Sequence, residues 1–202
     1  MLWLAAVTAQ ASGPVEERPT IDVAMTLGLR WVQPDGWDEF VQQQSIGANL
    51  SWRRPAWPLF LALDAHAGGK TNSEYDPNVG GTVYTNDATH VEFALGLRRI
   101  GYSRKLIYDL GSGLAWAYGG YGKDTVRVSP GGAFPQDSDS GFGPWAEAGL
   151  RFRFTDFYSA GVGARITSAH GTLYDRRVDL GGWQACVTFV GMTLPKRPKR
   201  QP

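Results

Sequence analysis

Residues 21–31 alternate without a break between apolar side chains and small or charged ones. The apolar positions are Ile21, Val23, Met25, Leu27, Leu29 and Trp31, and those between them are Asp22, Ala24, Thr26, Gly28 and Arg30. A strand sends successive side chains to opposite faces. This segment therefore predicts a strand with one hydrocarbon face, which meets either a protein core or lipid.

Seven further segments alternate in the same way. They cover about residues 46–53, 59–67, 91–98, 106–116, 142–154, 158–167 and 179–191. In the last, least regular segment we expect Trp183, Ala185, Val187 and Phe189 to point outward. Long connections (33–44, 68–89, 119–141, 170–178) alternate with short ones (54–58, 99–104, 155–156). This pattern predicts an all-β fold, a closed eight-stranded antiparallel up-and-down barrel with both chain ends at the short-turn end.

The polar faces decide between a soluble barrel, such as a lipocalin, and a transmembrane barrel. They are mostly Gly, Ala, Ser and Thr and carry no lysine, whereas a face in contact with water would carry many Lys and Glu. Small residues suit the inside of a narrow barrel, and Arg with Asp and Glu suits a buried ion-pair network. We expect lipid outside and a lumen network of Asp22, Arg30, Asp64, Glu92, Arg98, Asp109, Glu147, Arg151, Arg153 and Arg165.

Aromatic residues close to strand ends also favour a transmembrane barrel over a soluble one. The chain has 8 Trp and 8 Tyr, and no run of 18 apolar residues that would form a membrane-spanning helix. A transmembrane barrel needs only every second residue apolar. We predict aromatic girdles at the two membrane surfaces that include Trp31, Trp52, Tyr108, Trp116 and Tyr158.

With these features, the chain resembles the small eight-stranded outer-membrane barrels of Gram-negative bacteria, such as the barrel of outer-membrane protein A and the porin-like OmpW class. The resemblance covers about residues 20–194 and rests on architecture. It implies location in the bacterial outer membrane, contact with membrane lipid and lipopolysaccharide, and insertion by the barrel-insertion machinery. Gly182, Val187 and Phe189 resemble the family's C-terminal insertion signal, but a basic Pro-rich tail, residues 195–202, follows them.

The ends of the chain have their own compositions. Residues 1–11 end in Ala9-Gln10-Ala11 and indicate a signal peptide that lacks a positive start. Residues 12–19 are expected to be a linker. The basic tail is expected to be a solvated periplasmic end, or a contact to acidic envelope polymers. Cys186 is the single cysteine, so no disulfide forms within the chain.

Two histidines flank the connection 68–89 and raise the question of a metal site. If His66 and His90 lie opposite each other, Asp64 faces Glu92 one step deeper, and the four could bind a divalent metal. The stronger interpretation is that the carboxylates pair with inward arginines in a structural plug. We therefore expect no metal and no cofactor.

Three other patterns contain residues of types that can carry chemistry. Asp137 and Asp139 resemble half a calcium loop, but Ala148 stands where the closing Glu should be. Ser168 and His170 are the best candidates for a catalytic Ser–His pair, but the residues around them do not match the pattern of the lipid A deacylases. The long connections carry aromatic residues that either bind a partner or pack together as a cap: Trp37, Phe40, Tyr75, Tyr84, Tyr121 and Tyr174.

The sequence leaves three functions open. The first is a structural or surface-interaction protein whose lumen is filled by charges. The second is a narrow channel for small solutes, as in the OmpW class. The third, a lipid A-modifying enzyme, has the least support. The net charge of +1 gives no electrostatic footprint for nucleic acid, and we expect a monomer.

Overall fold

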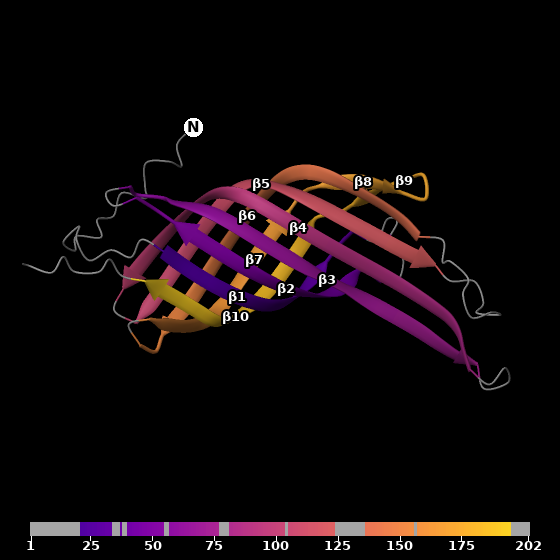
Figure 1. Ribbon diagram of the computed structural model, residues 1–202, viewed down its shortest axis with the longest axis horizontal. Helices are drawn as coiled ribbons and strands as arrows, with labels where there is room; N and C mark the ends of the chain where they lie inside the picture. The colour runs from indigo at the N-terminus through magenta and orange to yellow at the C-terminus, as the bar shows by residue number, and fades with distance from the viewer. Residues whose placement is uncertain are drawn as a thin grey trace, which may run out of the picture.

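The computed structural model describes residues 21–33, 37, 40–54, 57–76, 81–103, 105–123, 136–155 and 157–194. The predicted signal peptide, linker and basic tail lie outside these residues. Eight strands form a closed barrel (Figure 1). They are β1 (Ile21–Trp31), β2 (Gln42–Trp52), β3 (Phe60–Asp76), β4 (Gly81–Ser103), β5 (Leu106–Lys123), β6 (Gln136–Arg153), β7 (Tyr158–Thr167) and β10 (Gly182–Leu194). A small two-stranded sheet, β8 (His170–Leu173) with β9 (Arg176–Asp179), lies outside the barrel order.

Pairing of the first strand with the last closes the barrel. Ile21 lies opposite Leu194 and Trp31 opposite Trp183, so the first and last strands meet along their whole length. Every pairing around the barrel is antiparallel. Apart from this closure, each barrel strand pairs with the barrel strands that precede and follow it, and β7 pairs with β10 because β8 and β9 are outside the barrel. The predicted closed eight-stranded antiparallel barrel is confirmed.

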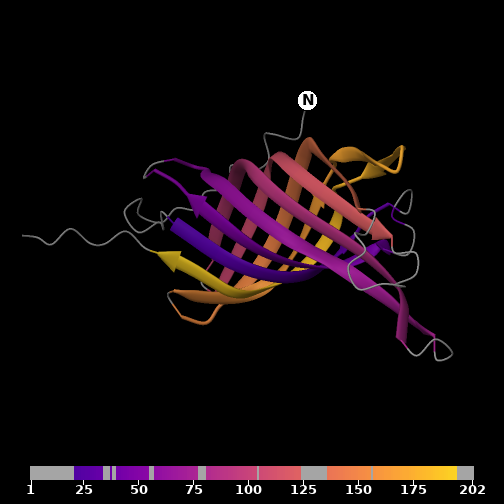
Figure 2. The ribbon, with the colours of Figure 1, turned by 45° about the vertical axis from the view of Figure 1, so that its right-hand side comes forward.

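Strand lengths differ from the prediction on one side of the barrel. β3–β4 pairing continues from Gly69–Thr89 to Asp76–Gly81, and β5–β6 pairing continues to Gly122–Gln136. These hairpins project beyond the barrel in both views (Figure 2), and we call this end the long-hairpin end and the other the short-turn end. The predicted loops 68–89 and 119–141 were too long. The apolar alternation ends in these extensions, although the backbone pairing continues.

The last strand is irregular because it carries a β-bulge. Met25 pairs with Val190 but the next residue, Thr26, pairs with Thr188, so Phe189 is the extra residue. Both Phe189 and Val190 are therefore exposed, and Gly191 turns inward. The strand also runs to 194, not 191 as predicted. Bulges change which face a residue occupies, and simple alternation does not reveal them.

The two faces of the barrel have opposite chemistry. Outward apolar side chains are exposed, for example Leu97 at 52 % and Leu114 at 66 %, whereas inward Asp22 and Arg165 are 3 % and 4 % exposed. A water-soluble barrel has the reverse arrangement. A contiguous outer belt of this kind fits lipid. In the part of the chain that the structure describes, no helix is long and apolar enough to cross a bilayer.

Candidate functional site

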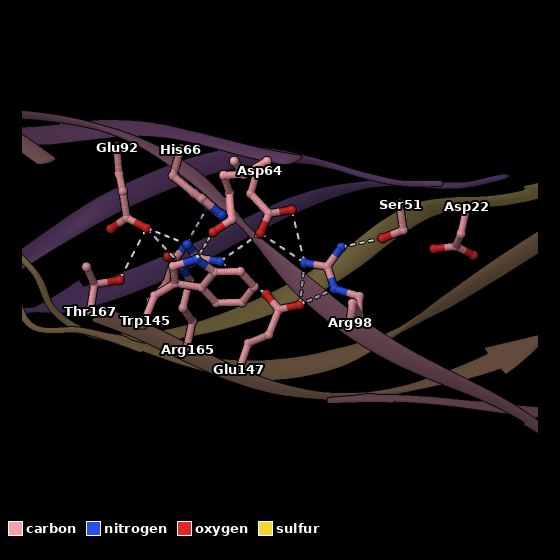
Figure 3. A network of polar contacts seen from close by, with 12 residues as sticks. Asp22, Ser51, Asp64, His66, Glu92, Arg98, Trp145, Glu147, Arg165 and Thr167 are labelled. Atoms are coloured by element: carbon pink, nitrogen blue, oxygen red, sulfur yellow. Dashed lines mark hydrogen bonds and ion pairs between the residues drawn. The ribbon is translucent and has the colours of Figure 1, made fainter. Parts of the chain in front are cut away.

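The centre of the lumen is filled by two arginines and three carboxylates, shown in Figure 3. Nη2 of Arg98 lies 3.0 Å from both carboxylate oxygens of Asp64, and its Nε donates to Glu147. Nη1 of Arg165 lies 3.0 Å from Asp64 and 3.2 Å from Glu147. Asp64 and Glu147 are thus shared by both guanidinium groups, which ties four strands, β3, β4, β6 and β7, across the lumen.

The cluster makes further hydrogen bonds to neighbouring side chains. Arg165 donates to Glu92 from Nε and Nη2, and the Thr167 hydroxyl donates to the same oxygen at 3.2 Å. Nη1 of Arg98 donates to the Ser51 hydroxyl at 2.5 Å. Charge-assisted bonds of this kind are strong and geometrically specific. The central cluster therefore acts as a crosslink that holds opposite walls together.

Trp145 packs against the central cluster and is not among the residues predicted from the sequence. Its indole lies 4.2 Å from the guanidinium carbon of Arg165, within cation–π range, and donates to the Leu95 carbonyl at 3.3 Å. Ala62, Ala94 and Ala115 surround the ring. A side chain at Gly96 would clash with it, at 2.7 Å. The signal available in the sequence was this row of very small residues on three neighbouring strands.

A second ion-pair group lies toward the short-turn end. Nη2 of Arg151 is 2.9 Å from Asp22, and its Nε is 3.6 Å from Asp109. Arg153 is half-buried on the same face of β6, one inward position closer to that end. Arg30 sits apart from both groups, nearer the long-hairpin end. It donates to Gln43 at 2.9 Å and to the Leu180 carbonyl.

Apolar residues cover the lumen at both ends. At the long-hairpin end Trp37 and Phe40 are fully buried among Val32, Tyr121, Leu173, Val178 and Leu180, which we call the cap. The Trp37 indole donates to the Asp179 carbonyl at 2.8 Å and so joins the β1–β2 connection to the β8–β9 hairpin. At the short-turn end Phe60, Ile100 and Ile107 form a smaller cluster, with Arg53 stacked on Phe60 at 4.9 Å.

A small hollow remains between the two ion-pair groups. Its volume is about 50 Å³, and its lining includes Thr26, Asn49, His66 and Cys186. Thr26 Oγ1, Asn49 Oδ1 and His66 Nε2 are buried and have no hydrogen-bond partner. A volume of this size holds a few water molecules, which would satisfy these atoms.

The four residues weighed as an alternative metal site, His66, His90, Asp64 and Glu92, do not come together as that site would need. His66 pairs with Glu92 and His90 with Gly68, so the His66–His90 and Asp64–Glu92 pairings that a metal site would need differ from the observed register by two residues. The register depends on a bulge between Glu74 and Tyr75, which alternation cannot show. Asp64 and Glu92 are bound to arginines, and within the described residues no group of three His, Cys, Asp or Glu could hold a metal ion.

Asp137 and Asp139, which resembled half a calcium loop, bind backbone amides instead. Asp139 accepts from the Thr172 amide at 2.6 Å and the Ser140 amide at 2.8 Å, and Asp137 accepts from the Tyr174 amide. These bonds fasten the β8–β9 hairpin to β6. The two backbone hydrogen bonds lower the pKa of the exposed Asp139 carboxyl below its ordinary value.

The other long-connection residues divide between the cap and the surface. Trp37, Phe40 and Tyr121 are buried in the cap, and exposed Tyr174 packs edge-on against Tyr121 at 5.8 Å. The side chains of Tyr75 and Tyr84 lie outside the described residues. Ser168 and His170 are both exposed, and no hydrogen bond joins them in the described part of the chain.

Aromatic residues form two outer groups at different heights of the barrel. At the short-turn end Trp52, Tyr108 and Tyr158 are exposed, together with Trp57, which the prediction omitted. Toward the long-hairpin end Trp31 lies opposite exposed Trp183. Half-buried Trp116 stacks there between Phe93 and Tyr118 at 5.9 and 6.4 Å. Two such levels are typical of the surfaces of a bilayer.

Comparison with known proteins supports the architecture. No protein-family model matches the sequence, and no curated protein does. Among solved structures, Neisserial surface protein A is similar with a TM-score of 0.56 at 11 % identity, covering 87 % of this chain and 97 % of that one. The outer membrane protein OprG of Pseudomonas aeruginosa gives 0.53 at 9 %, with 89 % and 97 % covered. Ail, the attachment invasion locus protein of Yersinia pestis, gives 0.50 at 11 %, with 86 % and 99 % covered.

These identities are low, so the likeness concerns the fold. The matched chains are covered almost completely, which means that the whole barrel is shared. The chain therefore has the fold of the small eight-stranded outer-membrane β-barrels.

Proposed function

We propose that this protein resides in the bacterial outer membrane as a non-conducting barrel with a structural or surface-interaction role. The observation that carries the proposal is the closure of the lumen at successive levels. The cap, the central cluster of Arg98 and Arg165, the Arg151 group and the Phe60 cluster follow one another along the axis. A solute would have to displace buried ion pairs as well as packed aromatic rings.

The location follows from the exposed belt together with the fold. If the protein were soluble, Leu97, Leu114 and the other outward apolar side chains would be in contact with water. Exposure of so much apolar surface to water is unfavourable. The expected behaviour is heat-modifiable migration on a gel and dependence on detergent for solubility. A protein that partitions into the aqueous phase without detergent would contradict the location.

The role is tested by conductance in planar bilayers. The wild-type barrel is expected to give no resolved single-channel steps. A variant that removes both the cap and the centre, Trp37→Ala with Glu92→Ala and Arg165→Ala, is expected to conduct once it is shown to fold. Regular single-channel steps from the wild-type protein would contradict the proposal that the lumen does not conduct.

The alternative function is a narrow channel for small solutes. Support for it comes from the hollow of about 50 Å³ and its buried polar atoms without partners, since these mark a hydrated stretch of the lumen. For this function, conductance should appear in the wild type and change when Glu92 and Arg98 are neutralised. If neither substitution changed the conductance, the ion pairs would not be its gate.

A further inference from the structure

One arginine of the barrel wall faces away from the lumen. Arg99 follows the belt residue Leu97 by two positions on β4 and pairs with Leu110 on β5, and both leucines are more than half exposed on the outer face. Arg99 itself is half-buried. Among the described residues, it is the one charged side chain that faces outward between the two aromatic levels. Its guanidinium therefore lies where the lipid-facing belt begins.

Arg99 has no partner in the part of the chain that the structure describes. No hydrogen bond, ion pair or ring contact reaches its guanidinium there, whereas the inward Arg98, Arg151 and Arg165 are each bound to carboxylates. A guanidinium stays charged and is costly to place against hydrocarbon. An arginine close to the edge of a bilayer avoids this cost by extending its charged end to the headgroups.

The outer surface around Arg99 offers no anion among the described residues. The acids at the short-turn end, Asp22 and Asp109, face the lumen and are bound to an arginine there. Arg54 and Lys105, in the adjacent short turns, are exposed and add positive charge. The described belt carries no carboxylate, so a second copy of the chain packed beside it could not supply the counter-ion. The anion has to come from the membrane.

Tyr108 places a hydroxyl beside Arg99 on the outer face. It pairs with Gly101, which is the next outward position of β4 after Arg99. A Cβ atom at Gly101 would collide with the Tyr108 ring and with its hydroxyl oxygen, so the ring lies across β4. Outward positions two residues apart on a strand are separated by about 7 Å. The hydroxyl and the guanidinium can therefore reach one ligand from the same side.

Short side chains lie beside these two donors on the outer surfaces of β5 and β6. Ala148 is opposite Leu110, and Ser112 is opposite Ala146 one outward position farther into the belt. All three small residues are exposed. They leave the wall lower than at the projecting Leu110, so a hydrocarbon chain can lie against the wall next to the guanidinium.

We propose that Arg99 and Tyr108 form a fixed site for the phosphate of one glycerophospholipid in the leaflet at the short-turn end. The guanidinium donates two parallel hydrogen bonds to phosphate oxygens, and the tyrosine hydroxyl donates a third. An acyl chain lies over Ser112, Ala146 and Ala148. The proposal rests on the proposed membrane location, with the short-turn end at the periplasmic side, and goes beyond it by assigning one class of lipid to one place on the wall.

Native mass spectrometry of the full chain, released from detergent micelles, counts the bound lipid. Phosphatidylglycerol is expected to bind at one molecule per barrel. Arg99→Gln should weaken binding about tenfold, the effect of one charge-assisted pair. Arg99→Lys should weaken it less, because it keeps the charge but loses the parallel bonds, and Tyr108→Phe about threefold. Equal binding by the wild type and Arg99→Gln would overturn the proposal.

Lys105→Gln is the matched control for charge. Lys105 is exposed at the same end, but its ammonium lies over Phe152 of β6, 5.9 Å from the ring centre, and not over β4. Its loss should leave lipid binding unchanged. A decrease equal to that of Arg99→Gln would show a general attraction to anions and overturn the site.

Two further probes identify the part of the lipid that is recognised. Diacylglycerol has the acyl chains without the phosphate and should not bind. Inorganic phosphate has the anion without the chains and should not compete at the concentration of the lipid. Binding of diacylglycerol equal to that of phosphatidylglycerol would overturn the phosphate site, and competition by inorganic phosphate would overturn its assignment to a lipid.

Unfolding in two kinds of vesicle separates a bound phosphate from a charge that the membrane merely tolerates. Arg99→Leu should lower the urea midpoint in phosphatidylglycerol vesicles, where a partner is lost, and raise it in vesicles of a galactolipid without phosphate. A higher midpoint in both would overturn the proposal. Heat-modifiable migration is recorded for every variant. A wild type that inserts without preferring the phospholipid refutes the site alone, whereas a wild type that does not insert refutes the membrane location.

Discussion

Arg165 donates from both Nε and Nη2 to the same oxygen of Glu92, at 2.9 and 2.6 Å, across 73 positions of sequence. Both side chains are almost fully buried. A buried charge without its partner is costly, commonly about 3–5 kcal/mol. This pair is therefore a point at which the stability of the barrel depends on two strands, β4 and β7, that are not neighbours in the sheet.

The first prediction concerns this pair. Glu92→Gln should destabilise the barrel by about 3 kcal/mol, because Arg165 then loses its nearest anion inside the lumen. Urea unfolding in lipid vesicles, followed by tryptophan fluorescence, measures the change. The double variant Glu92→Gln with Arg165→Met should lose less stability than the sum of the two single variants, because the two side chains interact directly. Additive losses in the two variants would show that the side chains are not coupled.

The second prediction concerns the cap. Trp37→Ala should lower stability by about 3–5 kcal/mol, since it empties a fully buried site. It also removes the hydrogen bond to Asp179, so the backbone around 179–181 should exchange hydrogen faster. Trp57→Ala is the matched control, because Trp57 is 49 % exposed at the short-turn end. If both variants lose the same stability, the cap is not a packed plug.

The third prediction concerns the docking of the β8–β9 hairpin and its dependence on pH. The backbone amides of Thr172 and Ser140 hold the pKa of Asp139 below its ordinary value. A lowered pKa in the folded state means that the docking stability is present above the ordinary carboxyl pKa, about 3.9, and is lost as pH falls through the lowered value.

The Thr172 amide reports on this docking directly. Its NMR shift should stay constant from pH 7 to about pH 4 and then move as Asp139 is protonated. In Asp139→Asn the shift should start near its acid position and no longer titrate. A transition near neutral pH, or one that persists in the variant, would assign the effect to another group.

The fourth prediction tests the outer belt. Leu97 is 52 % exposed and pairs with Ser112, between the aromatic levels of Tyr108 and Trp116. Leu97→Arg should cost about 2–4 kcal/mol in a bilayer, because the charge meets hydrocarbon. Ser140→Arg, on the exposed outer face of β6 beyond the belt, should cost little. The same small effect at both positions would mean that water, not lipid, surrounds the belt.

Sequence patterns predicted the barrel because alternation is a local property of each strand. Segments such as 21–31 and 158–167 were placed with their ends as observed. The hairpin extensions were missed because their sequences do not alternate, although their backbones pair. The inward positions of the charged residues followed from the same parity, but parity does not say which arginine meets which carboxylate.

The register of β3 against β4 illustrates that limit. Alternation is unchanged by a shift of two residues, so it could not distinguish His66 opposite His90 from His66 opposite Glu92. The bulge beside Tyr75 and the position of the turn decide this. The burial of Trp37 could not be predicted from the sequence either, because Trp37 contacts Asp179, which is 142 positions away.

The sequence by itself determined the number of barrel strands and which face of each strand is apolar. It also determined that the polar face has side chains too small and too rich in arginine for a surface in water. These are properties of neighbouring residues and of period two. Tertiary structure alone decided that Asp64 is shared by Arg98 and Arg165, and that the β1–β2 connection closes the mouth. Each of these depends on register and closure, which bring together side chains from strands that are distant in the chain.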